Sequence, residues 1–554
     1  MSERIFIAVA WPYADGPLHL GHIAGAYLPP DIFARYHRAK GNEVLMVSGS
    51  DQHGTPITIK AEQEGKKPGE MAALYHQQFL DSWQRFGISF DLFTTTGTAN
   101  HAQVSQDIFL TLLNKDYIYK ATVLQPYCPR CQRFLPDRYI EGTCPYCHSS
   151  GTRGDQCDEC GKPINPAELI DPHCRLCAAT PQFKNSEHFF FRLSAFRDRL
   201  LAWVKQQTHW RQNVLNFTTR YLEEGLKDRA ITRDIDWGVP VPVEGFDGKR
   251  IYVWFEAVIG YLSATKEWAK SSGDEEGWRS FWEEGAKSYY FIGKDNIPFH
   301  TIIWPAMLMG YGGLNLPYDV PANEFLTIEG KKLSTSRNWA VWLPDYLSRY
   351  EPDPLRYLLS INMPETGDTD FSWREFVRRN NDELVATYGN LVHRVLTFVY
   401  RRFNGCVPQP GEFDSHSQAL IDKAEDTLHI MDELLYHCHF KEAIRSAMSL
   451  AQETNRYLDE KSPWKIIEQD REASATALYV AISVISCLRT ALYPFLPFSS
   501  QKLHQLLGFK GDVQDDGWQL RIPSPGQQLL SPTPLFSKLD EKLVEKEASR
   551  LGQV

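Results

Sequence analysis

The chain has 554 residues, of which 43% are hydrophobic and 23% charged, with a formal net charge of −10 at pH 7. This balance excludes disordered and collagen-like chains, and the length predicts about two to four domains. The negative charge excludes a surface coated in basic residues, so a nucleic acid would be met by local basic patches. No uninterrupted apolar run reaches the roughly 18 residues that span a bilayer, and residues 1–4 lack a signal-peptide pattern. We therefore expect a cytoplasmic protein with no membrane partner.

The first predicted unit is a strand, a turn and the start of a helix. The apolar run 5–10 predicts the strand, residues 11–16 form a turn with Pro and Gly, and His19 and His22 stand three residues apart. This spacing places two imidazoles on one side of a helical turn, and Gly21 lets a ligand approach the backbone. Such imidazoles can donate hydrogen bonds to polyphosphate oxygens. Taken alone, the motif is also compatible with one surface and one packed histidine.

Residues 1–115 continue as alternating strands and helices. Residues 43–49 predict a second strand, followed by a polar loop at 50–56. Helices are predicted at about 68–85 and 99–114, separated by the segment 90–94. This alternation predicts an α/β fold with a Rossmann-like parallel sheet.

Four C-x-x-C pairs interrupt the pattern between about 116 and 184. Each pair can bind Zn²⁺ through two thiolates, and two pairs complete a closed tetrahedral site. Because disulfides are rare in a reducing compartment, four pairs predict two structural zinc ions. We favour a nested arrangement, in which the two inner pairs share one ion and the two outer pairs the other; consecutive pairing is the alternative. The pairs are Cys128 and Cys131, Cys144 and Cys147, Cys157 and Cys160, and Cys174 and Cys177.

The α/β pattern resumes after the cysteine region. Residues 250–255 and 288–293 predict buried strands, each followed by a loop and a helix. The cysteine region is therefore expected to be an insertion that splits one catalytic domain. A mixed connector follows at about 321–385, and it contains a basic, hydroxyl-rich loop at residues 330–337, which we call the lysine loop.

Strand signals nearly vanish beyond the connector. Apolar residues recur at steps of three and four, which predicts an antiparallel all-α helix bundle. The charged, amphipathic tail at 539–552 is expected to fold back as a final helix. The predicted bundle helices lie around 380–403, 415–436, 439–460, 463–470 and 472–494.

Two distant motifs together resemble the signatures of class I aminoacyl-tRNA synthetases. They are the H-x-G-H segment at 19–22 and the segment Lys-Leu-Ser-Thr-Ser at 332–336. Within that class, the chain is similar to the methionyl-tRNA synthetases over nearly its whole length. The resemblance implies activation of L-methionine with ATP to methionyl-adenylate, followed by transfer to tRNA(Met), including initiator tRNA. It is carried further by residues 10–16, 51–57, 252–261 and 291–295 and by the four cysteine pairs.

The resemblance also implies a division of the chain into six parts. The catalytic domain would be split into two halves by the zinc-knuckle insertion, and a KMSKS-loop connector that contacts the tRNA stem would lead to a helical anticodon-binding domain. The parts are 1–115, first catalytic half; 116–226, connective insertion; 227–320, second catalytic half; 321–385, connector; 386–538, anticodon-binding domain; and 539–554, tail.

For catalysis, the resemblance implies that His19 and His22 contact the ATP phosphates and that Lys332 neutralises charge on the β- and γ-phosphates, with Mg²⁺ accompanying ATP. The substrate carboxylate is the nucleophile, so the protein supplies positioning and charge stabilisation. Many family members carry lysine where this chain has Thr335, so that role must pass to Lys331, Lys332 or Arg337, or the loop is weaker. The implied ATP-binding residues are His19, His22, Gly293, Asp295, Lys331, Lys332, Ser334, Thr335 and Ser336.

For methionine, the resemblance implies that Asp51 binds the α-ammonium with Arg233 in support. An aromatic cage suits the side chain, because a thioether is apolar and polarizable. Trp11 stands where many relatives carry leucine. Core packing is the competing interpretation of each aromatic residue. The implied methionine-binding residues are Ala10, Trp11, Tyr13, Asp51, Arg233, Trp254, Ala257, Val258, Tyr261 and His300.

For tRNA, the resemblance implies that Asn390, Arg394 and Trp464 read the anticodon. Asn390 and Arg394 stand four residues apart on one predicted helix face, and Trp464 begins another helix. An aromatic ring can stack an unpaired base while Asn or Arg bonds its edge. The competing interpretation is a solvated helix face with a core tryptophan.

Three other functions stay open. A cysteinyl synthetase would hold zinc in its active site, and no cysteine lies beside either signature. A non-catalytic tRNA-binding paralogue is supported only by Thr335. A nucleotidyltransferase that uses the histidine motif alone would leave the insertion and the helical half unexplained. We expect a monomer, because the tRNA-binding extension through which some family members dimerise is missing.

Overall fold

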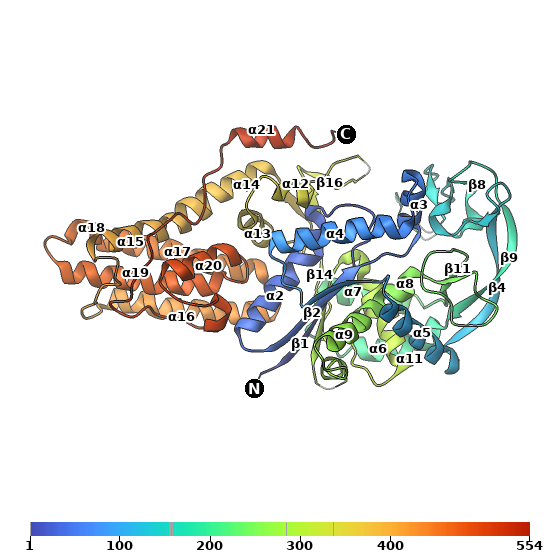
Figure 1. Cartoon of the computed structure of the whole chain (residues 1–554), viewed down its shortest axis with the longest axis horizontal. Coiled ribbons are helices and arrows are strands. Elements are labelled where there is room, and N and C mark those ends of the chain that lie inside the picture. Colours follow the sequence, from blue (N-terminus) through green and yellow to red (C-terminus); the bar gives the residue numbers. More distant parts are fainter. Residues whose placement is uncertain are drawn as a thin grey trace.

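The computed structural model describes residues 2–154, 157, 159, 160, 162, 164–283, 285–335 and 337–553. The molecule is elongated, with a helical bundle at one end, a parallel sheet in the middle and a β-rich arm at the other end (Figure 1). This arrangement confirms the predicted fold class, an α/β region followed by an all-α bundle.

Five parallel strands form the central sheet, in the order β14-β13-β1-β2-β3. Residues 5–9 of β1 are completely buried, because strands pair on both of its edges and helices flank the sheet. Since all five strands point the same way, the loops that follow them gather at one edge of the sheet. The strands are β1 (Arg4–Val9), β2 (Glu43–Ser50), β3 (Leu92–Thr95), β13 (Lys287–Gly293) and β14 (Ala322–Asn323).

The helices of the first half largely follow the sequence prediction. The predicted helices at 68–85 and 99–114 are α4 and α5. Gly65 and Gly87 end α3 and α4 in the left-handed conformation, with φ of +64° and +76°. The helices packed around the sheet are α1 (Leu20–His22), η1 (Ile23–Tyr27), α2 (Leu28–Ala39), α3 (Thr55–Glu64), α4 (Pro68–Phe86), α5 (Ala99–Asn114), α9 (Gly260–Ser271), α10 (Arg279–Trp282), η7 (Phe299–Ile303) and α11 (Trp304–Tyr311).

The strand predicted at 250–255 is wrong beyond its first two residues. Residues Arg250–Ile251 form β12, and the chain then turns into α8 (Val253–Glu256) and η5 (Ala257–Ile259). The backbone N–H groups of Phe255 and Glu256 donate to the carbonyl of Tyr252, which starts the helix. A short apolar run cannot by itself distinguish a buried strand from a buried helix.

The β-rich arm is built on one long antiparallel pair. Strand β4 (Ile118–Cys128) pairs with β9 (Gln182–Phe191) from Ile118 opposite Phe191 to Tyr127 opposite Gln182. Tyr139 joins the arm to the α/β region through a 2.8 Å hydrogen bond from its hydroxyl to Oγ1 of Thr58 on α3. The smaller elements of the arm are β5 (Arg133–Phe134), η2 (Asp137–Tyr139), β6 (Ile140–Thr143), β7 (Thr152–Arg153), η3 (Pro166–Glu168) and β8 (Ile170–Cys174). The segment that returns from the arm to the sheet contains η4 (Leu193–Phe196), α6 (Arg197–Val204), α7 (Gln212–Glu223), β10 (Arg229–Ala230) and β11 (Thr232–Arg233).

A mixed connector joins the sheet to the bundle. The lysine loop begins at a hairpin in which β15 (Leu326–Ile328) pairs with β16 (Lys331–Lys332), and β17 (Thr369–Phe371) lies parallel to β15. The other connector elements are α12 (Leu343–Leu347), α13 (Pro352–Ile361) and α14 (Trp373–Arg379), whereas η6 (Lys294–Asn296) directly follows strand β13 of the central sheet.

The bundle follows the predicted helices with two differences. The short helix predicted at 463–470 ends at Ile466, since Asp470 caps the next helix through the backbone N–H of Ala473. Helix α20 was not predicted. The elements are η8 (Asn380–Gly389), α15 (Asn390–Arg402), α16 (Ser415–Tyr436), α17 (Phe440–Lys461), α18 (Pro463–Ile466), α19 (Arg471–Leu492), α20 (Pro497–Leu506), η9 (Val513–Asp516) and, in the tail, α21 (Lys542–Ala548).

Helix α19 is apolar because it is the centre of the bundle. Within the part of the chain that the structure describes, it is the one helix long and apolar enough to cross a membrane, with a mean hydropathy of 1.6 over its most apolar window. Of that window, 94% is buried inside the protein. Serine, threonine and arginine residues interrupt the apolar sequence of this helix, so it contains no uninterrupted apolar run of about 18 residues.

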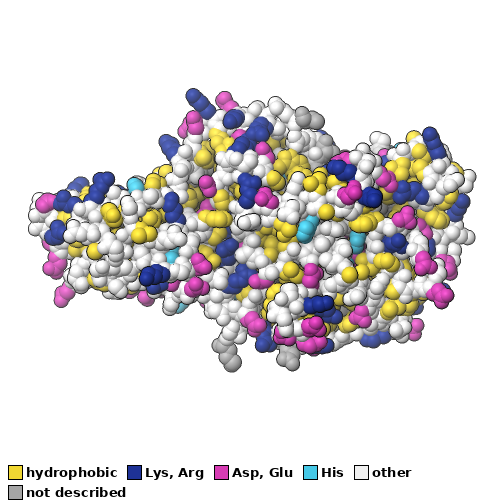
Figure 2. All heavy atoms as spheres, viewed as in Figure 1, with side chains coloured by type: hydrophobic (Ala, Val, Ile, Leu, Met, Phe, Trp, Pro, Cys, Tyr) yellow, Lys and Arg dark blue, Asp and Glu magenta, His cyan; other side chains and the backbone are white. Residues whose placement is uncertain are grey.

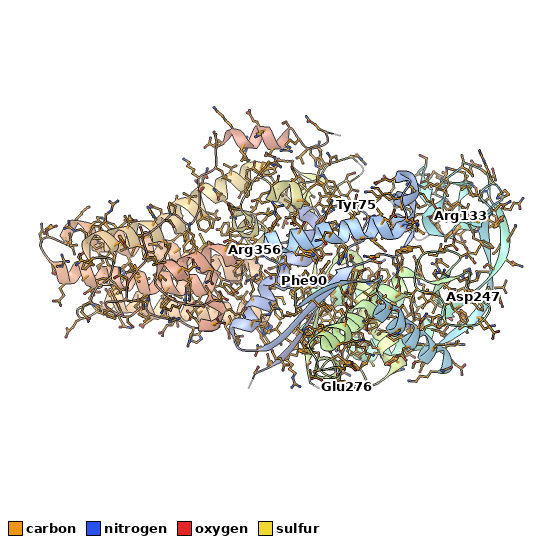
Figure 3. The ribbon with its side chains drawn as sticks, in the orientation of Figure 1. Tyr75, Phe90, Arg133, Asp247, Glu276 and Arg356 are labelled. Atoms are coloured by element: carbon orange, nitrogen blue, oxygen red, sulfur yellow. The ribbon has the colours of Figure 1, made fainter. Side chains whose placement is uncertain are left out.

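A buried ion pair joins the bundle to the α/β region, and Figure 3 shows Arg356 at this junction. Arg356 on α13 and Asp31 on α2 have no exposed side-chain surface, and their charged groups lie 2.7 Å apart. The guanidinium also donates to the carbonyls of Pro494 and Phe495, which follow α19. One side chain therefore connects three parts of the molecule.

Candidate active site

The loops after β1 and β2 are paired with each other at the carboxyl end of the sheet. The backbone N–H of Asp51 donates to Pro12 at 2.8 Å, and the N–H of Ala14 donates to Asp51 at 2.9 Å. Tyr13 and Asp51 thereby face each other in a parallel bridge. Two predicted methionine-binding residues from different strand ends are brought together.

His19 and His22 form a stacked pair. Their ring centroids lie 3.7 Å apart, with 12° between the ring planes. Nδ1 of each ring accepts the backbone N–H of the other residue at 3.3 Å, so this hydrogen-bond network assigns the proton of each neutral ring to Nε2. Burial lowers the pKa of His19 to about 4 and that of His22 well below its usual range. At neutral pH the pair therefore offers two uncharged N–H donors.

The lysine loop packs directly on the histidine motif. The N–H of Leu20 donates to Val341 at 3.1 Å, and that of Leu343 donates to Leu18 at 2.8 Å, so the segment after the loop pairs with residues 18–20. A Cβ built on Gly21 would lie 2.6 Å from Cδ1 of Leu333. Segments some three hundred residues apart in the sequence thus form one site.

Lys331 and Lys332 take different positions in the lysine loop. Both lysines are exposed, and Lys331 places its Nζ 4.3 Å from the ring centre of Trp339. Burial raises the pKa of Asp295, and the charges of Lys294 and Lys332 oppose that rise. Lys332 therefore lies near Asp295, which belongs to the short helix η6 directly after Gly293, the last residue of β13.

Ser334 and Thr335 of the lysine loop lie in a tight turn. The N–H of Trp339 donates to Ser334 at 2.9 Å, and that of Asn338 donates to Thr335 at 3.2 Å. Thr335, the departure from the family pattern, is exposed. Ser336, also expected to bind ATP, lies outside the described residues.

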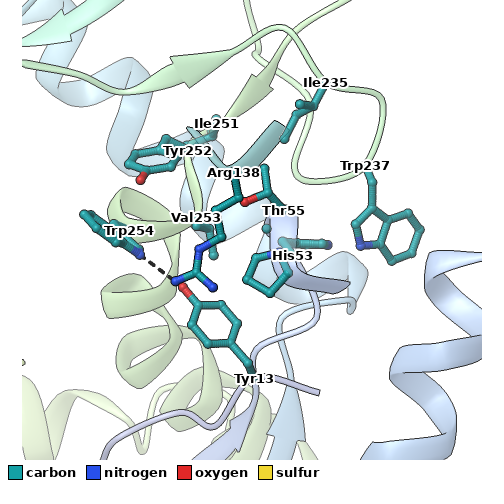
Figure 4. Close-up of a pocket in the computed structure, with 12 residues that line it drawn as sticks. Tyr13, His53, Thr55, Arg138, Ile235, Trp237, Ile251, Tyr252, Val253 and Trp254 are labelled. Carbon is teal, nitrogen blue, oxygen red and sulfur yellow. Dashed lines mark hydrogen bonds between the residues drawn. The ribbon is translucent and has the colours of Figure 1, made fainter. Parts of the chain in front are cut away.

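A narrow cavity of about 20 Å³ opens beside the paired loops (Figure 4). Such a volume holds about one water molecule. Trp254 donates its indole N–H to the hydroxyl of Tyr13 at 3.0 Å, and burial raises the pKa of that hydroxyl above its usual range. The lining residues are Tyr13, His53, Gly54, Thr55, Pro56, Arg138, Ile235, Trp237, Ile251, Tyr252, Val253 and Trp254.

The other aromatic residues predicted for methionine lie outside this cavity lining. The hydroxyl of Tyr261 lies 2.7 Å from Nε2 of His300, whose Nδ1 lies 2.9 Å from the carbonyl of Asn296. Because a carbonyl only accepts, Nδ1 carries the proton and Nε2 accepts from Tyr261. Burial lowers the pKa of His300 to about 4, so the ring is neutral. Ala257 and Val258 belong to the adjoining turn η5.

Trp11 fits its position because glycines face its ring. A Cβ on Gly49 would lie 2.3 Å from this indole, and one on Gly260 would lie 2.7 Å from it. The ring also meets Tyr261 edge-on, with centroids 6.4 Å apart. Within the described residues, the indole N–H of Trp11 is buried and has no hydrogen-bond partner. Ala10 precedes Trp11, and its carbonyl accepts the hydroxyl proton of Tyr27 at 3.0 Å.

Asp51 and Arg233 are held by different neighbours. Asp51 is 3% exposed, and its Oδ1 accepts the backbone N–H of His53 at 3.1 Å. Burial, and next the charge of Glu256, raise the pKa of Asp51 well above its usual range. The guanidinium of Arg233 lies 3.6 Å from the ring centre of Tyr252, a residue that lines the cavity.

Sequence reasoning missed several residues at this site. Arg138 comes from the cysteine-rich arm and reaches the cavity, where Figure 4 shows its guanidinium beside Tyr13. No local motif marks it, because only the packing of the arm brings it there. Glu256 is completely buried beneath the site. It is the one acidic residue in the apolar run 252–261, and this isolated charge is the sequence feature that could have indicated it.

The three predicted anticodon residues lie at the outer part of the bundle. The guanidinium of Arg394 lies 4.3 Å from the ring centre of Trp464 and donates to Asn455 at 3.3 Å. Asn390, at the start of the same helix α15, is exposed. Basic and acidic side chains are interspersed on the face shown in Figure 2, so a tRNA would meet local basic groups, as the net charge predicts.

The eight paired cysteines gather into two groups of four. Within each group, the sulfur atoms all lie within 4.8 Å of one another. The inner pairs form one group and the outer pairs the other, so the thiols follow the nested arrangement and consecutive pairing is wrong. The groups are Cys144, Cys147, Cys157 and Cys160, and Cys128, Cys131, Cys174 and Cys177.

Comparison with known families gives the class of the protein. The family model for tRNA synthetases class I (M) matches residues 5–396, and that for the anticodon binding domain of methionyl tRNA ligase matches residues 407–554. Together with the parallel sheet and the paired histidine and lysine motifs, these matches define a class I aminoacyl-tRNA synthetase.

Comparison with individual relatives identifies the family within this class. A methionine–tRNA ligase of Dehalococcoides mccartyi is 64% identical over 552 residues and covers 100% of both chains. One of Thermomicrobium roseum is 53% identical over 100% of this chain and 99% of its own. A structure of Mycobacterium tuberculosis methionyl-tRNA synthetase in complex with methionyl-adenylate matches with a TM-score of 0.80 at 26% identity, covering 97% of this chain and 100% of that one. The chain belongs to the methionyl-tRNA synthetase family, which confirms the predicted enzyme class.

The contact between Gly21 and Leu333 predicts the effect of one methyl group. Gly21→Ala would place a Cβ 2.6 Å from Leu333 and displace the lysine loop. We expect about a tenfold slower ATP–pyrophosphate exchange, because a shift of about 1 Å in a positioning group can cost up to a hundredfold. Gly25→Ala on the same helical segment is the matched control, since its Cβ would meet nothing within 4 Å. Equal rates for the two variants would contradict this contact.

Proposed function

We propose that methionine activation takes place where the histidine motif, the lysine loop and the Tyr13–Asp51 bridge meet. The packing of Leu333 against Gly21 is the observation that carries this proposal, because it brings Lys332 to the same site as two neutral imidazoles. Phosphate stabilisation and substrate positioning are the whole task of a protein whose substrate carboxylate is itself the nucleophile.

In this proposal, ATP lies across the carboxyl ends of β1 and β13. The Nε2–H groups of His19 and His22 donate to phosphate oxygens as pyrophosphate leaves. Lys332 neutralises the charge on the β- and γ-phosphates, Mg²⁺ accompanies the nucleotide, and Asp295 with Gly293 meets the ribose. Lys331 and the hydroxyls of 334–336 complete the phosphate contacts. Since Thr335 brings no charge, the two adjacent lysines and Arg337 take the role of the missing lysine.

Methionine binds with its ammonium on Asp51 and its side chain among aromatic residues. The Tyr261–His300 hydrogen bond supports this role, because it satisfies both polar groups and leaves ring surfaces for the thioether. The cavity of about 20 Å³ holds about one water, so lining side chains such as Tyr13 and Trp254 move to admit the substrate. The remaining members of the site are Ala10, Trp11, Arg233, Ala257 and Val258.

The second substrate is tRNA(Met), including initiator tRNA, and Asn390, Arg394 and Trp464 read its anticodon. The Arg394–Trp464 stack supports this role, because it presents a flat ring beside a hydrogen-bonding group. We also propose the six-part division of the chain that the family resemblance implies. We take the enzyme to act as a cytoplasmic monomer.

Each cysteine group holds one structural Zn²⁺. A tetrahedral ion with Zn–S bonds of about 2.3 Å requires sulfur atoms about 3.8 Å apart. The sulfurs of Cys131 and Cys174 lie 3.9 Å apart, as do those of Cys144 and Cys160. Four thiolates leave no open position, so the ions stabilise the arm and take no part in catalysis.

The role of Lys332 is tested by substitution to alanine. Lys332→Ala removes a charge that acts mainly as pyrophosphate departs, so kcat of ATP–pyrophosphate exchange should fall about a hundredfold while KM for methionine changes less than threefold. The wild-type exchange should depend on methionine and not on cysteine or leucine. Unchanged kcat in the variant would remove Lys332 from the mechanism.

Trp464 tests the tRNA site separately from the active site. Trp464→Ala removes a stacking surface worth about 1–3 kcal/mol per base, so kcat/KM for tRNA in aminoacylation should fall about tenfold or more. ATP–pyrophosphate exchange should stay within twofold of wild type, since it needs no tRNA. Phe498→Ala is a matched control, because this aromatic residue is 45% exposed and lies on α20, away from the proposed anticodon residues. Parallel loss of both activities in Trp464→Ala would contradict the assignment.

Metal counting tests the zinc proposal. The wild type should contain about two zinc ions per chain by atomic spectroscopy. Replacing Cys128 and Cys174 with serine should remove one ion, because both cysteines belong to one group. Loss of both ions, or a metal-free wild type, would contradict the proposal; Cys406→Ser is the control, as this residue belongs to neither group.

A further inference from the structure

Glu256 carries a completely buried carboxylate beneath the methionine site. Its Oε1 lies 2.7 Å from Nδ1 of His53, and its Oε2 lies 2.8 Å from Nε2 of His101. All three side chains are at least nine-tenths buried. Since a carboxylate only accepts, both rings donate to it. A charge this deep persists only when its oxygens are paired, and here both are.

The carboxylate links three separate parts of the site. His53 lies in the loop after β2, two residues beyond Asp51, and its backbone N–H donates to Asp51 at 3.1 Å. His101 belongs to the first turn of α5, and its Nδ1 lies 2.9 Å from Oγ of Ser263 on α9. Glu256 itself ends α8, directly before Ala257. The proposed ammonium site and side-chain pocket are therefore joined through one residue.

The same arrangement has an electrostatic consequence. Burial by itself raises the pKa of Glu256, but the two histidines outweigh burial and lower this pKa to about 2. Glu256 is therefore charged at every working pH, and it lies close enough to raise the pKa of Asp51. The other groups facing Asp51 are the carboxylate of Asp15, which acts in the same direction, and the donors of His53 and Thr96, which oppose it.

We propose that Glu256 is a positioning residue for methionine, which fixes Asp51 relative to the side-chain pocket and places a second buried carboxylate beside the proposed ammonium site. The proposal rests on the proposed assignment of Asp51 to the ammonium. It gives the enzyme a way to discriminate against uncharged amines and thioethers, because only a cation offsets two neighbouring buried carboxylates.

The sign of the pH effect follows from Asp51. Binding requires ionised Asp51, so kcat/KM for methionine rises as pH increases through the pKa of this group. Glu256→Gln removes a neighbouring negative charge, which lowers the pKa of Asp51. The acidic limb of the pH profile should therefore move to lower pH. A purely structural role for Glu256 would leave the position of that limb unchanged.

The experiment compares four variants of the full-length enzyme by methionine-dependent ATP–pyrophosphate exchange across pH. Glu256→Gln should raise KM for methionine about tenfold, leave KM for ATP within twofold, and shift the acidic limb. Glu256→Asp keeps the charge on a shorter side chain, so KM should rise without a shift of the limb. Glu267→Gln is the matched control and should behave as wild type. The hydroxyl of Thr94 donates to this half-buried carboxylate, and His101 acts on it through charge only, since no hydrogen bond among the described residues joins Glu267 to either histidine of the cluster.

The fourth variant, Asp51→Asn, separates this inference from the assignment on which it depends. If Asp51→Asn leaves KM for methionine unchanged, the proposed ammonium site is wrong. If Asp51→Asn raises KM but Glu256→Gln matches Glu267→Gln in KM and pH profile, only the role of Glu256 is overturned. Should thermal denaturation show that Glu256→Gln is unfolded, His101→Gln replaces it. His101→Gln keeps the negative charge of Glu256 but alters the imidazole contact that holds its Oε2. It should raise KM for methionine about tenfold, and an unchanged KM would overturn the proposal.

Discussion

Two short stretches of backbone pairing bring the loops of the candidate site together. One joins Tyr13 to Asp51 at the ends of neighbouring strands, and the other joins residues 18–20 to 341–343. Parallel strands leave their loops at one edge of the sheet, but they do not by themselves hold those loops in contact. Without these pairings the histidine motif and the lysine loop would belong to separate parts of the molecule. The active site is thus a product of loop pairing on a rigid sheet.

The charges of the site are divided between a dry interior and an exposed loop. Burial keeps His19, His22 and His300 neutral at physiological pH, so they act as hydrogen-bonding groups rather than as cations. Lys332 stays exposed, where its charge needs no buried partner. Under the proposed function, the opposite charges arrive with the substrates: ATP would bring phosphates to Lys332, and methionine would bring an ammonium group to Asp51. This division avoids the desolvation cost of a preformed buried cation.

Much of the fold was predictable because its periodicities are strong. Strand β2, helices α4 and α5 and the long bundle helices agree with the apolar recurrence to within a few residues. The segment 250–255 was not predictable, since an apolar run fits a buried strand or a buried helix equally well. The nested cysteine groups were anticipated, whereas α20 lies in a stretch with weak periodicity and was missed.

The residues of the candidate site were harder to predict from the sequence than the fold. His19, Asp51 and Lys332 belong to local motifs that can be read directly. Arg138 reaches the cavity only because the arm folds back over α3, and no local pattern records that contact. Glu256 shows the opposite case, because a lone acid in an apolar run was visible but its two histidine partners lie 203 and 155 residues away.

The most direct test of the central claim is a crystal structure of this chain with a non-hydrolysable methionyl-adenylate analogue. We expect the ammonium group on Asp51, the phosphoryl group beside His19 and His22, and Lys332 turned toward the phosphoryl group from the lysine loop. An analogue bound elsewhere, or bound at the sheet edge with Lys332 pointing away and no contact to either histidine, would contradict this claim.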